Sequence, residues 1–310
     1  MYESEKNKLT GVQGIFPTPF LENGDVDYVG LAENVRKDIK NGYRFLTCTG
    51  TGGEFYALTT EEHKNVIKTV CEAASEFKDV AVVPCIGTTS LRTAVELAQA
   101  AEEAGADAVM VTPSFYLPQS LENLKAYFAE LAKNTSLPFD FYYYPEVHHT
   151  YLSPVELADL LLDNDHFIAM KETALATVAS VQIAELVADR INIITGASEY
   201  MAPETALIGG KGFVWTWMHI MPKMPLKIWE ATEKGDYGLA AAMRKKVMRF
   251  DVMLAASGLS CTSTYKLLDE IFGFAGGPAR NAAVPKVRNR EELKKLVECI
   301  REIREDPIFR

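Results

Sequence analysis

Long hydrophobic runs are missing from this sequence of 310 residues. No uncharged stretch reaches about 18 residues, the usual minimum for a membrane-spanning helix. The N-terminal segment, MYESEKNKLT, is polar and lacks the apolar core of a signal peptide. We therefore expect a soluble, cytoplasmic protein.

Cysteine and clustered positive charge are also scarce. The 5 cysteines form an odd set without a C-x-x-C pair, which argues against a disulfide framework and a zinc knuckle. The net charge is -10 and no Lys/Arg-rich run occurs, so the basic surface that nucleic acids and anionic membranes require is absent. We expect reduced thiols and a small-molecule partner, with no nucleic acid and no membrane.

Several motifs of metal and hydrolase chemistry are absent as well. The 5 histidines form no H-E-x-x-H motif, and we expect the adjacent His148 and His149 to be surface loop residues. The alternative is that one of the two contacts a polar substrate. No G-x-S-x-G sequence provides a serine nucleophile. The glycines around Lys211 are not followed by G-K-[ST], so they predict a helix stop and not a phosphate loop. The sequence predicts no metal site.

Short apolar runs do recur, and they alternate with amphipathic stretches long enough for helices. This alternation is typical of β/α units around a parallel sheet. An eightfold repeat closes naturally into a barrel, so the sequence predicts an α/β protein with a (β/α)8 TIM barrel. The expected strands are 14–20, 45–50, 80–87, 108–113, 139–145, 167–173, 191–196 and 212–217.

Capping residues set the helix limits. Thr60, Ser120 and Ser153 each precede acidic residues and predict helix starts, while Gly105 predicts a helix end. From residue 223 no strand pattern returns, and we expect helices over 223–256, 260–273 and 290–305. The chain is thus predicted to contain a catalytic barrel, 1–222, and a C-terminal helical extension, 223–310, packed against it.

Polar residues at the strand ends are the first candidates for chemistry, because barrel enzymes build their active sites there. Lys171 lies in the otherwise apolar strand IAMKET, so its ammonium should point into the barrel. Burial disfavours the charged form and leaves a nucleophilic amine suited to attack on a carbonyl. The alternative is a lysine whose side chain extends to solvent.

Two further strand ends complement Lys171. Tyr142 lies on the preceding predicted strand and can move protons, whereas Tyr143 should point to the opposite face. Three consecutive tyrosines could also simply fill a barrel layer. The glycine-rich turn TGTGGEF can offer main-chain N–H groups and the Thr51 hydroxyl to a carboxylate, or it is only a tight turn.

Taken together, these strand ends resemble the family of dihydrodipicolinate synthase and N-acetylneuraminate lyase, the pyruvate-type class I aldolases. The resemblance extends over nearly the whole chain, through GIFPTPF, GTGGEF, TPSFY, YYYP, MKET, GGKG and GGPAR. It implies a barrel with a C-terminal helical extension, a homotetramer, and no metal or organic cofactor. By this resemblance Lys171 matches the Schiff-base lysine, Tyr142 the proton-relay tyrosine, and Thr51 the residue that holds the pyruvate carboxylate.

The resemblance also implies the substrate-binding residues. Tyr116 resembles a tyrosine that reaches a neighbouring subunit's site, and Thr173 and Glu199 match residues that bind the sugar end in sialic acid lyases. We expect Trp215 and Trp217 to stack on a sugar or close the pocket. The full set of expected substrate-binding residues is Gly52, Thr173, Gly196, Ser198, Glu199, Thr216 and Tyr116.

Two departures from the family pattern bear on the substrate. Gly52 stands where the synthases and lyases commonly have a second hydroxyl residue. The G-S-G-G-E-F form of the motif, which resembles that of 2-keto-3-deoxygluconate aldolases, also has glycine there, which suggests that the glycine is compatible with catalysis. No arginine occurs in the stretch 146–149 after Pro145, where the synthases bind the carboxylate of their second substrate. The favoured prediction is therefore cleavage of a 2-oxo sugar acid, N-acetylneuraminate or a 2-keto-3-deoxy sugar acid, to pyruvate and an aldehyde. The alternatives are a sugar acid dehydratase, dihydrodipicolinate synthesis, and a barrel that only senses a 2-oxo acid.

Overall fold

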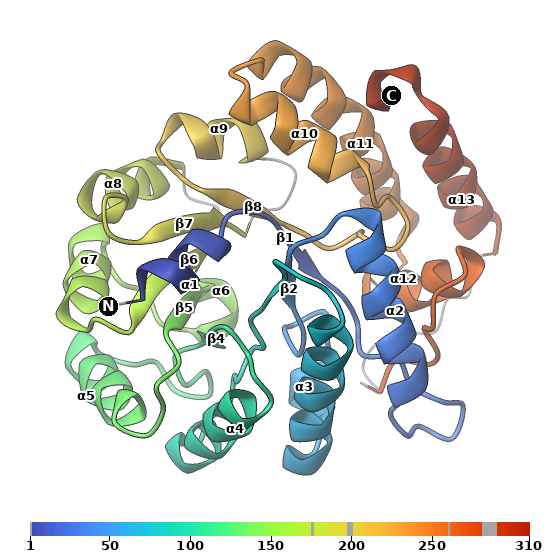
Figure 1. Ribbon diagram of the computed structural model, residues 1–310. Helices are drawn as coiled ribbons and strands as arrows, with labels where there is room; N and C mark the ends of the chain where they lie inside the picture. Colours follow the sequence, from blue (N-terminus) through green and yellow to red (C-terminus); the bar gives the residue numbers. More distant parts are fainter. Residues whose placement is uncertain (1, 175–176, 197–200, 260, 281–289) are drawn as a thin grey trace.

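A computed structural model describes residues 2–174, 177–196, 201–259, 261–280 and 290–310. They form an 8-stranded parallel sheet surrounded by helices (Figure 1). The strands are β1 (Gly11–Ile15), β2 (Phe45–Thr47), β3 (Ala81–Val82), β4 (Val109–Val111), β5 (Phe139–Tyr143), β6 (Phe167–Glu172), β7 (Asn192–Thr195) and β8 (Gly212–Trp215). Their order is β3-β2-β1-β8-β7-β6-β5-β4, and a bridge from Cys85 to Met110 closes the ring. The predicted (β/α)8 barrel is confirmed.

The first strand begins earlier than predicted. The sequence favoured 14–20, but β1 is Gly11–Ile15 and pairs with β2 and β8. Pro17 and Pro19 have no N–H to donate to a central ladder, so the strand ends before them. Every other predicted strand contains an observed one, although β3 has shrunk to Ala81–Val82.

A helix follows each strand. These helices are α2 (Tyr28–Asn41), α3 (Thr60–Ser75), α4 (Leu91–Glu103), α5 (Leu121–Ala132), α7 (Pro154–Asp163), α8 (Thr177–Val187), α9 (Ala202–Leu207) and α10 (Met224–Glu233), with the short η1 (Phe55–Ala57) and α6 (Pro145–His148) in loops. Ser120 and Ser153 cap their helices as predicted, and Gly105 has a positive φ of 83° after α4. The cap of α3 is Thr59, not Thr60: its side chain accepts the N–H of Glu62, and Glu62 reaches back in a capping box.

The barrel interior is a separate apolar cluster from the layer between strands and helices. Inward residues such as Ile15, Met110, Ile194 and Val214 form it. α1 (Glu3–Lys8) lies across the N-terminal mouth, and Asn192 Nδ2 donates to the main-chain oxygens of Lys6 and Leu9 at 2.8 and 3.0 Å. Figure 1 shows this helix in dark blue over the strands. The opposite mouth is left for the site.

The C-terminal helices lie together on one side of the barrel (Figure 1). The predicted helix 223–256 is wrong in one respect, because Gly235, at φ 75°, separates α10 from α11 (Tyr237–Ser257). α12 (Cys261–Ile271), α13 (Arg290–Glu305) and η3 (Pro307–Phe309) follow. The division of the chain at residue 222 stays a prediction. Within the described ranges, no helix is both long and apolar enough to cross a membrane.

Candidate active site

Lys171 and Tyr142 lie side by side inside the barrel. They are directly paired residues of β6 and β5, and both are almost fully buried, at 4% and 3% exposure. Lys171 Nζ lies 3.7 Å from the centroid of the Tyr142 ring. The alternative of a lysine extending to solvent is therefore wrong, and the predicted pair is brought into contact.

The surroundings of this pair favour neutral side chains. Burial lowers the pKa of Lys171 to about 8, although Cys85 and Asp140 act in the opposite direction. Burial raises the pKa of the Tyr142 phenol well above 10.0, and hydrogen bonding from the Thr51 side chain only partly opposes this shift. With this pKa about a tenth of the amine is free at pH 7, far more than for a lysine with the ordinary pKa, while the phenol keeps its proton.

The glycine-rich turn after β2 approaches the same pair. Thr49 and Glu54 both have left-handed φ values, 53° and 55°, which side chains other than glycine rarely adopt. A Cβ on Gly53 would lie 2.9 Å from the main-chain nitrogen of Thr49, so only glycine fits there. The turn therefore has a fixed shape that carries Thr51 to the Tyr142 phenol.

Gly52 differs from its neighbour Gly53. It has no positive φ, and a Cβ would meet only Ile15 Cγ2, at 3.9 Å. The backbone therefore does not require glycine at this position. The missing side chain leaves space next to Thr51.

Thr173 and Gly196 meet at the ends of β6 and β7. Thr173 is 7% exposed, and its Oγ1 is buried without a hydrogen-bond partner among the described residues. A Cβ on Gly196 would collide with that oxygen at 1.8 Å. Gly196 thus makes room for the Thr173 hydroxyl. Ser198 and Glu199, also expected in the substrate site, lie outside the described residues.

The remaining predicted residues are less enclosed. Thr216 follows β8 and is half-buried, and continues the inward alternation of Gly212 and Val214. Tyr116 is 81% exposed in the loop after β4. An exposed Tyr116 in a single chain fits a residue whose role depends on a neighbouring subunit.

The favoured prediction for His148 is wrong. This residue was expected at the surface, but it is 2% exposed and its ring contacts the Tyr142 ring edge-on, at 5.2 Å between centroids. Burial, with smaller effects of Lys171 and His149, lowers its pKa to about 4, so the imidazole is neutral. Pro145 indicates only that a helix begins there, because proline favours the first position of a helix; that this short α6 turns His148 inward has no signal in the sequence. His149 is exposed as expected.

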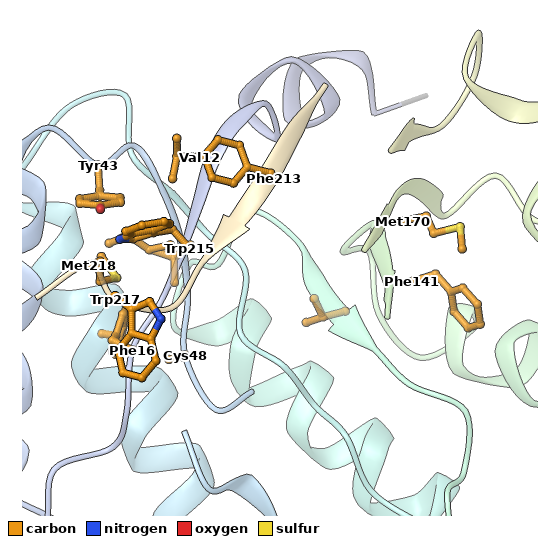
Figure 2. Packing of buried hydrophobic residues seen from close by; sticks show 14 of the residues in the cluster. Val12, Phe16, Tyr43, Cys48, Phe141, Met170, Phe213, Trp215, Trp217 and Met218 are labelled. Carbon is orange, nitrogen blue, oxygen red and sulfur yellow. The ribbon is translucent and has the colours of Figure 1, made fainter. Parts of the chain in front are cut away.

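Trp215 and Trp217 do not line the pocket, which corrects the sequence prediction. They are 0% and 4% exposed and belong to the core between strands and helices. Figure 2 shows both indoles among Phe16, Tyr43 and Met218. Trp217 Nε1 donates to Asp251 Oδ1 at 3.1 Å, so it is held by the C-terminal helix α11.

Across the described ranges, no group of three or more His, Cys, Asp and Glu side chains could hold a metal ion. The chemistry that this site offers comes from an amine, a phenol, hydroxyls and main-chain N–H groups.

The fold and these groups define a class of protein, the (β/α)8 barrels with a buried reactive lysine on the sixth strand. The chain matches the model of the dihydrodipicolinate synthetase family over residues 8–301 and belongs to that family. Family members are pyruvate-dependent lyases and synthases, and this chain is an enzyme of that kind.

Individual relatives agree with this assignment. The 4-hydroxy-tetrahydrodipicolinate synthase of Methanocaldococcus jannaschii is 31% identical over 292 residues, which are 93% of this chain and 97% of that protein. 4-Hydroxy-tetrahydrodipicolinate synthase 1 of Streptomyces coelicolor is 30% identical over 263 residues, covering 85% and 84%. The crystal structure of dihydrodipicolinate synthase from Oceanobacillus iheyensis has a TM-score of 0.86 and 26% identity, covering 96% of this chain and 98% of that one.

Proposed function

We propose that this enzyme forms a Schiff base between Lys171 and the C2 carbonyl of pyruvate. The observation that carries the proposal is a lysine at 4% exposure, with a pKa lowered to about 8, in contact with a phenol that stays protonated. A neutral amine attacks the carbonyl, and loss of water from the carbinolamine gives a protonated imine. The protonated imine then withdraws electrons from C3.

Tyr142 and Thr51 move the protons in this scheme. The phenol donates a proton to the departing carbinolamine hydroxyl and takes back the proton that C3 loses as the enamine forms, with Thr51 hydrogen-bonded beside it. It then donates this proton to the aldehyde oxygen as the carbon–carbon bond forms. The turn at Gly52 binds the pyruvate carboxylate through main-chain N–H groups and the Thr51 hydroxyl. Loss of a C3 proton gives an enamine, which adds to an aldehyde carbon. Hydrolysis of the new imine releases the product and restores Lys171.

Two candidate reactions differ in the aldehyde that the enamine attacks. The names of the relatives favour the alternative of the sequence analysis, condensation of pyruvate with aspartate semialdehyde, over its main prediction. The residues after Pro145 supply no arginine for the carboxylate of that aldehyde. The buried, unpartnered Thr173 hydroxyl favours a hydroxylated aldehyde, and hence sugar acid cleavage, as the second candidate.

Trapping with borohydride tests the imine directly. Wild-type protein treated with pyruvate and borohydride should gain the mass of a reduced pyruvate adduct, and peptide mapping should place it on Lys171. Lys171→Ala should gain no adduct, whereas Lys211→Ala, which removes an exposed lysine, should behave as wild type. An adduct that persists in Lys171→Ala contradicts the proposal.

Product analysis then separates the reactions. Pyruvate with aspartate semialdehyde, N-acetylneuraminate and 2-keto-3-deoxy sugar acids should be compared under the same conditions. Consumption of the semialdehyde supports the synthase, release of pyruvate supports the sugar acid lyase, and loss of water without cleavage supports the dehydratase. Binding of pyruvate with no turnover on any of them supports a sensor.

We also propose that the protein is cytoplasmic and forms a homotetramer. Sedimentation of the purified protein measures its oligomeric state and tests the second part.

A further inference from the structure

A polar cluster crosses the barrel interior one layer below Lys171. Gln13 on β1 directs its Nε2 to Asp140 Oδ2 on β5 and to Thr47 Oγ1 on β2, both at 3.0 Å. All three residues are 0% exposed, in an interior otherwise formed by apolar side chains. Because β1 and β5 are separated by three strands in the sheet order, the hydrogen bond from Gln13 to Asp140 spans the barrel, whereas Thr47 lies on the neighbouring strand.

Asp140 lies on β5, next to the strand β6 that carries Lys171. It pairs with Ala169 on β6, two residues before Lys171, so the two side chains point inward on successive layers. A buried carboxylate without a cationic partner would be costly, whereas one beneath an amine that becomes cationic gains from the attraction. Burial raises the pKa of Asp140 to about 6, against the hydrogen bond from Gln13 and the attraction of Lys171, so it is mostly ionised above neutral pH.

The other titratable groups near Lys171 are neutral at that pH. Cys85, after β3, has its pKa raised to about 11 by burial, and the Tyr142 phenol on β5 stays protonated for the same reason. His148 on α6, with a pKa of about 4, is an uncharged imidazole. Among the described residues that face Lys171, Asp140 is therefore the group with a charge.

We propose that Asp140, fixed by Gln13 across the barrel, is a positioning residue that supplies the counter-charge for the cation on Lys171. That cation is the ammonium before attack on the substrate and the protonated imine afterwards. The inference depends on the proposed imine at Lys171 and extends it to the residues beneath. Asp140 does not touch the substrate in this scheme, and acts through the charge it places under the nitrogen.

The negative charge on Asp140 determines the direction in which its removal changes the pKa of Lys171. Removing the carboxylate destabilises the ammonium, so the pKa of Lys171 falls further and free amine is present at lower pH. The same removal destabilises the protonated imine, so pyruvate binds more weakly where the amine is already neutral. Two unit charges about 7 Å apart, at an effective dielectric constant of about 20, correspond to a pKa change of about 1.7 units.

The test is the pH dependence of imine formation in Asp140→Asn, which keeps the shape and the acceptor for Gln13. Initial rates of adduct formation with pyruvate and cyanoborohydride, from pH 5 to pH 10, should rise through about pH 8 in the wild type and one to two units lower in the variant. Above pH 8.5, the pyruvate concentration for half-maximal adduct should increase at least tenfold. Thr47→Val keeps the carboxylate and should leave the midpoint at the wild-type value.

Gln13→Leu provides a second variant if Asp140→Asn does not fold. It removes the donor that favours the ionised carboxylate, so it should shift the midpoint in the same direction. A lower rate with an unchanged midpoint in both variants overturns the inference, because a purely structural role predicts that result. Absence of an adduct in the wild type overturns the imine proposal itself, and the two failures are thus distinct.

Discussion

Tyr142 and Tyr143, which are neighbours on β5, have different roles: the first belongs to the active site and the second stabilises the structure. Tyr142 faces Lys171, while the Tyr143 hydroxyl accepts the N–H of Leu152 at 2.9 Å and donates to its carbonyl oxygen at 3.2 Å. Strand alternation requires this division, and it could be predicted from the sequence. The burial of His148 could not, because neither its spacing nor its type indicates which way a four-residue helix turns it.

The two tyrosines make a matched pair of variants. Tyr142→Phe keeps the ring beside Lys171 but removes the proton donor, and we expect kcat to fall about 100-fold with little change in stability. Tyr143→Phe loses two hydrogen bonds in the loop to α7, and should lower the free energy of unfolding by about 1 kcal/mol with activity near wild type. Steady-state kinetics and urea unfolding check both. Equal kinetic effects in the two variants would contradict the assigned roles.

At the scale of elements, the turn between β2 and η1 positions Thr51 and the main chain of Gly52 in the site. Its shape depends on left-handed Thr49 and Glu54 and on the close contact at Gly53. The sequence indicated a glycine-rich turn but not which glycine the backbone requires, because that depends on contacts with Thr49 that only the folded turn creates. Helix limits show the same kind of error: Thr59 and Thr60 are equally good caps in the sequence, and the capping box with Glu62 selects Thr59.

Substitutions at the two glycines test this description. Gly52→Ser places its Cβ in ordinary contact with Ile15, so the free energy of unfolding should change by less than about 0.5 kcal/mol and pyruvate turnover should persist. Gly53→Ala forces the main chain away from Thr49, and the KM for pyruvate should rise at least tenfold (about 1.4 kcal/mol). Thermal unfolding and kinetics distinguish them. Inactivation by Gly52→Ser alone would mean that the turn binds substrate differently.

At the scale of the whole molecule, the C-terminal helices are coupled to the site by buried charge. Lys266 on α12 forms an ion pair with Glu54 of the turn, at 2.6 Å, and both side chains are 0% exposed. Lys266 Nζ also lies 3.9 Å from the centroid of the Phe20 ring. The closed barrel and the packed helical extension were predictable from the eight strand patterns and the cap signals. This long-range pair, like the burial of Trp215 and Trp217, depends on how the extension docks and has no local signal.

Breaking this pair should affect stability and the site together. Lys266→Met leaves the Glu54 carboxylate buried without its ammonium partner, and we expect a loss of about 3 kcal/mol in the free energy of unfolding, with a higher KM for pyruvate. Lys246→Met removes the more exposed ion pair with Asp306 and should leave the unfolding transition unchanged. Chemical denaturation of both variants measures the difference. Similar small effects in both would show that the buried pair does not hold the turn.

A crystal structure of the enzyme soaked with pyruvate tests the central claim most directly. The account predicts continuous electron density from Lys171 Nζ to C2 of the ligand, with the carboxylate at Thr51 and the main chain of Gly52 and with the Tyr142 hydroxyl beside C2. Pyruvate bound elsewhere in the barrel, or bound next to Lys171 without a covalent bond at pH values above the pKa of the lysine, would contradict it.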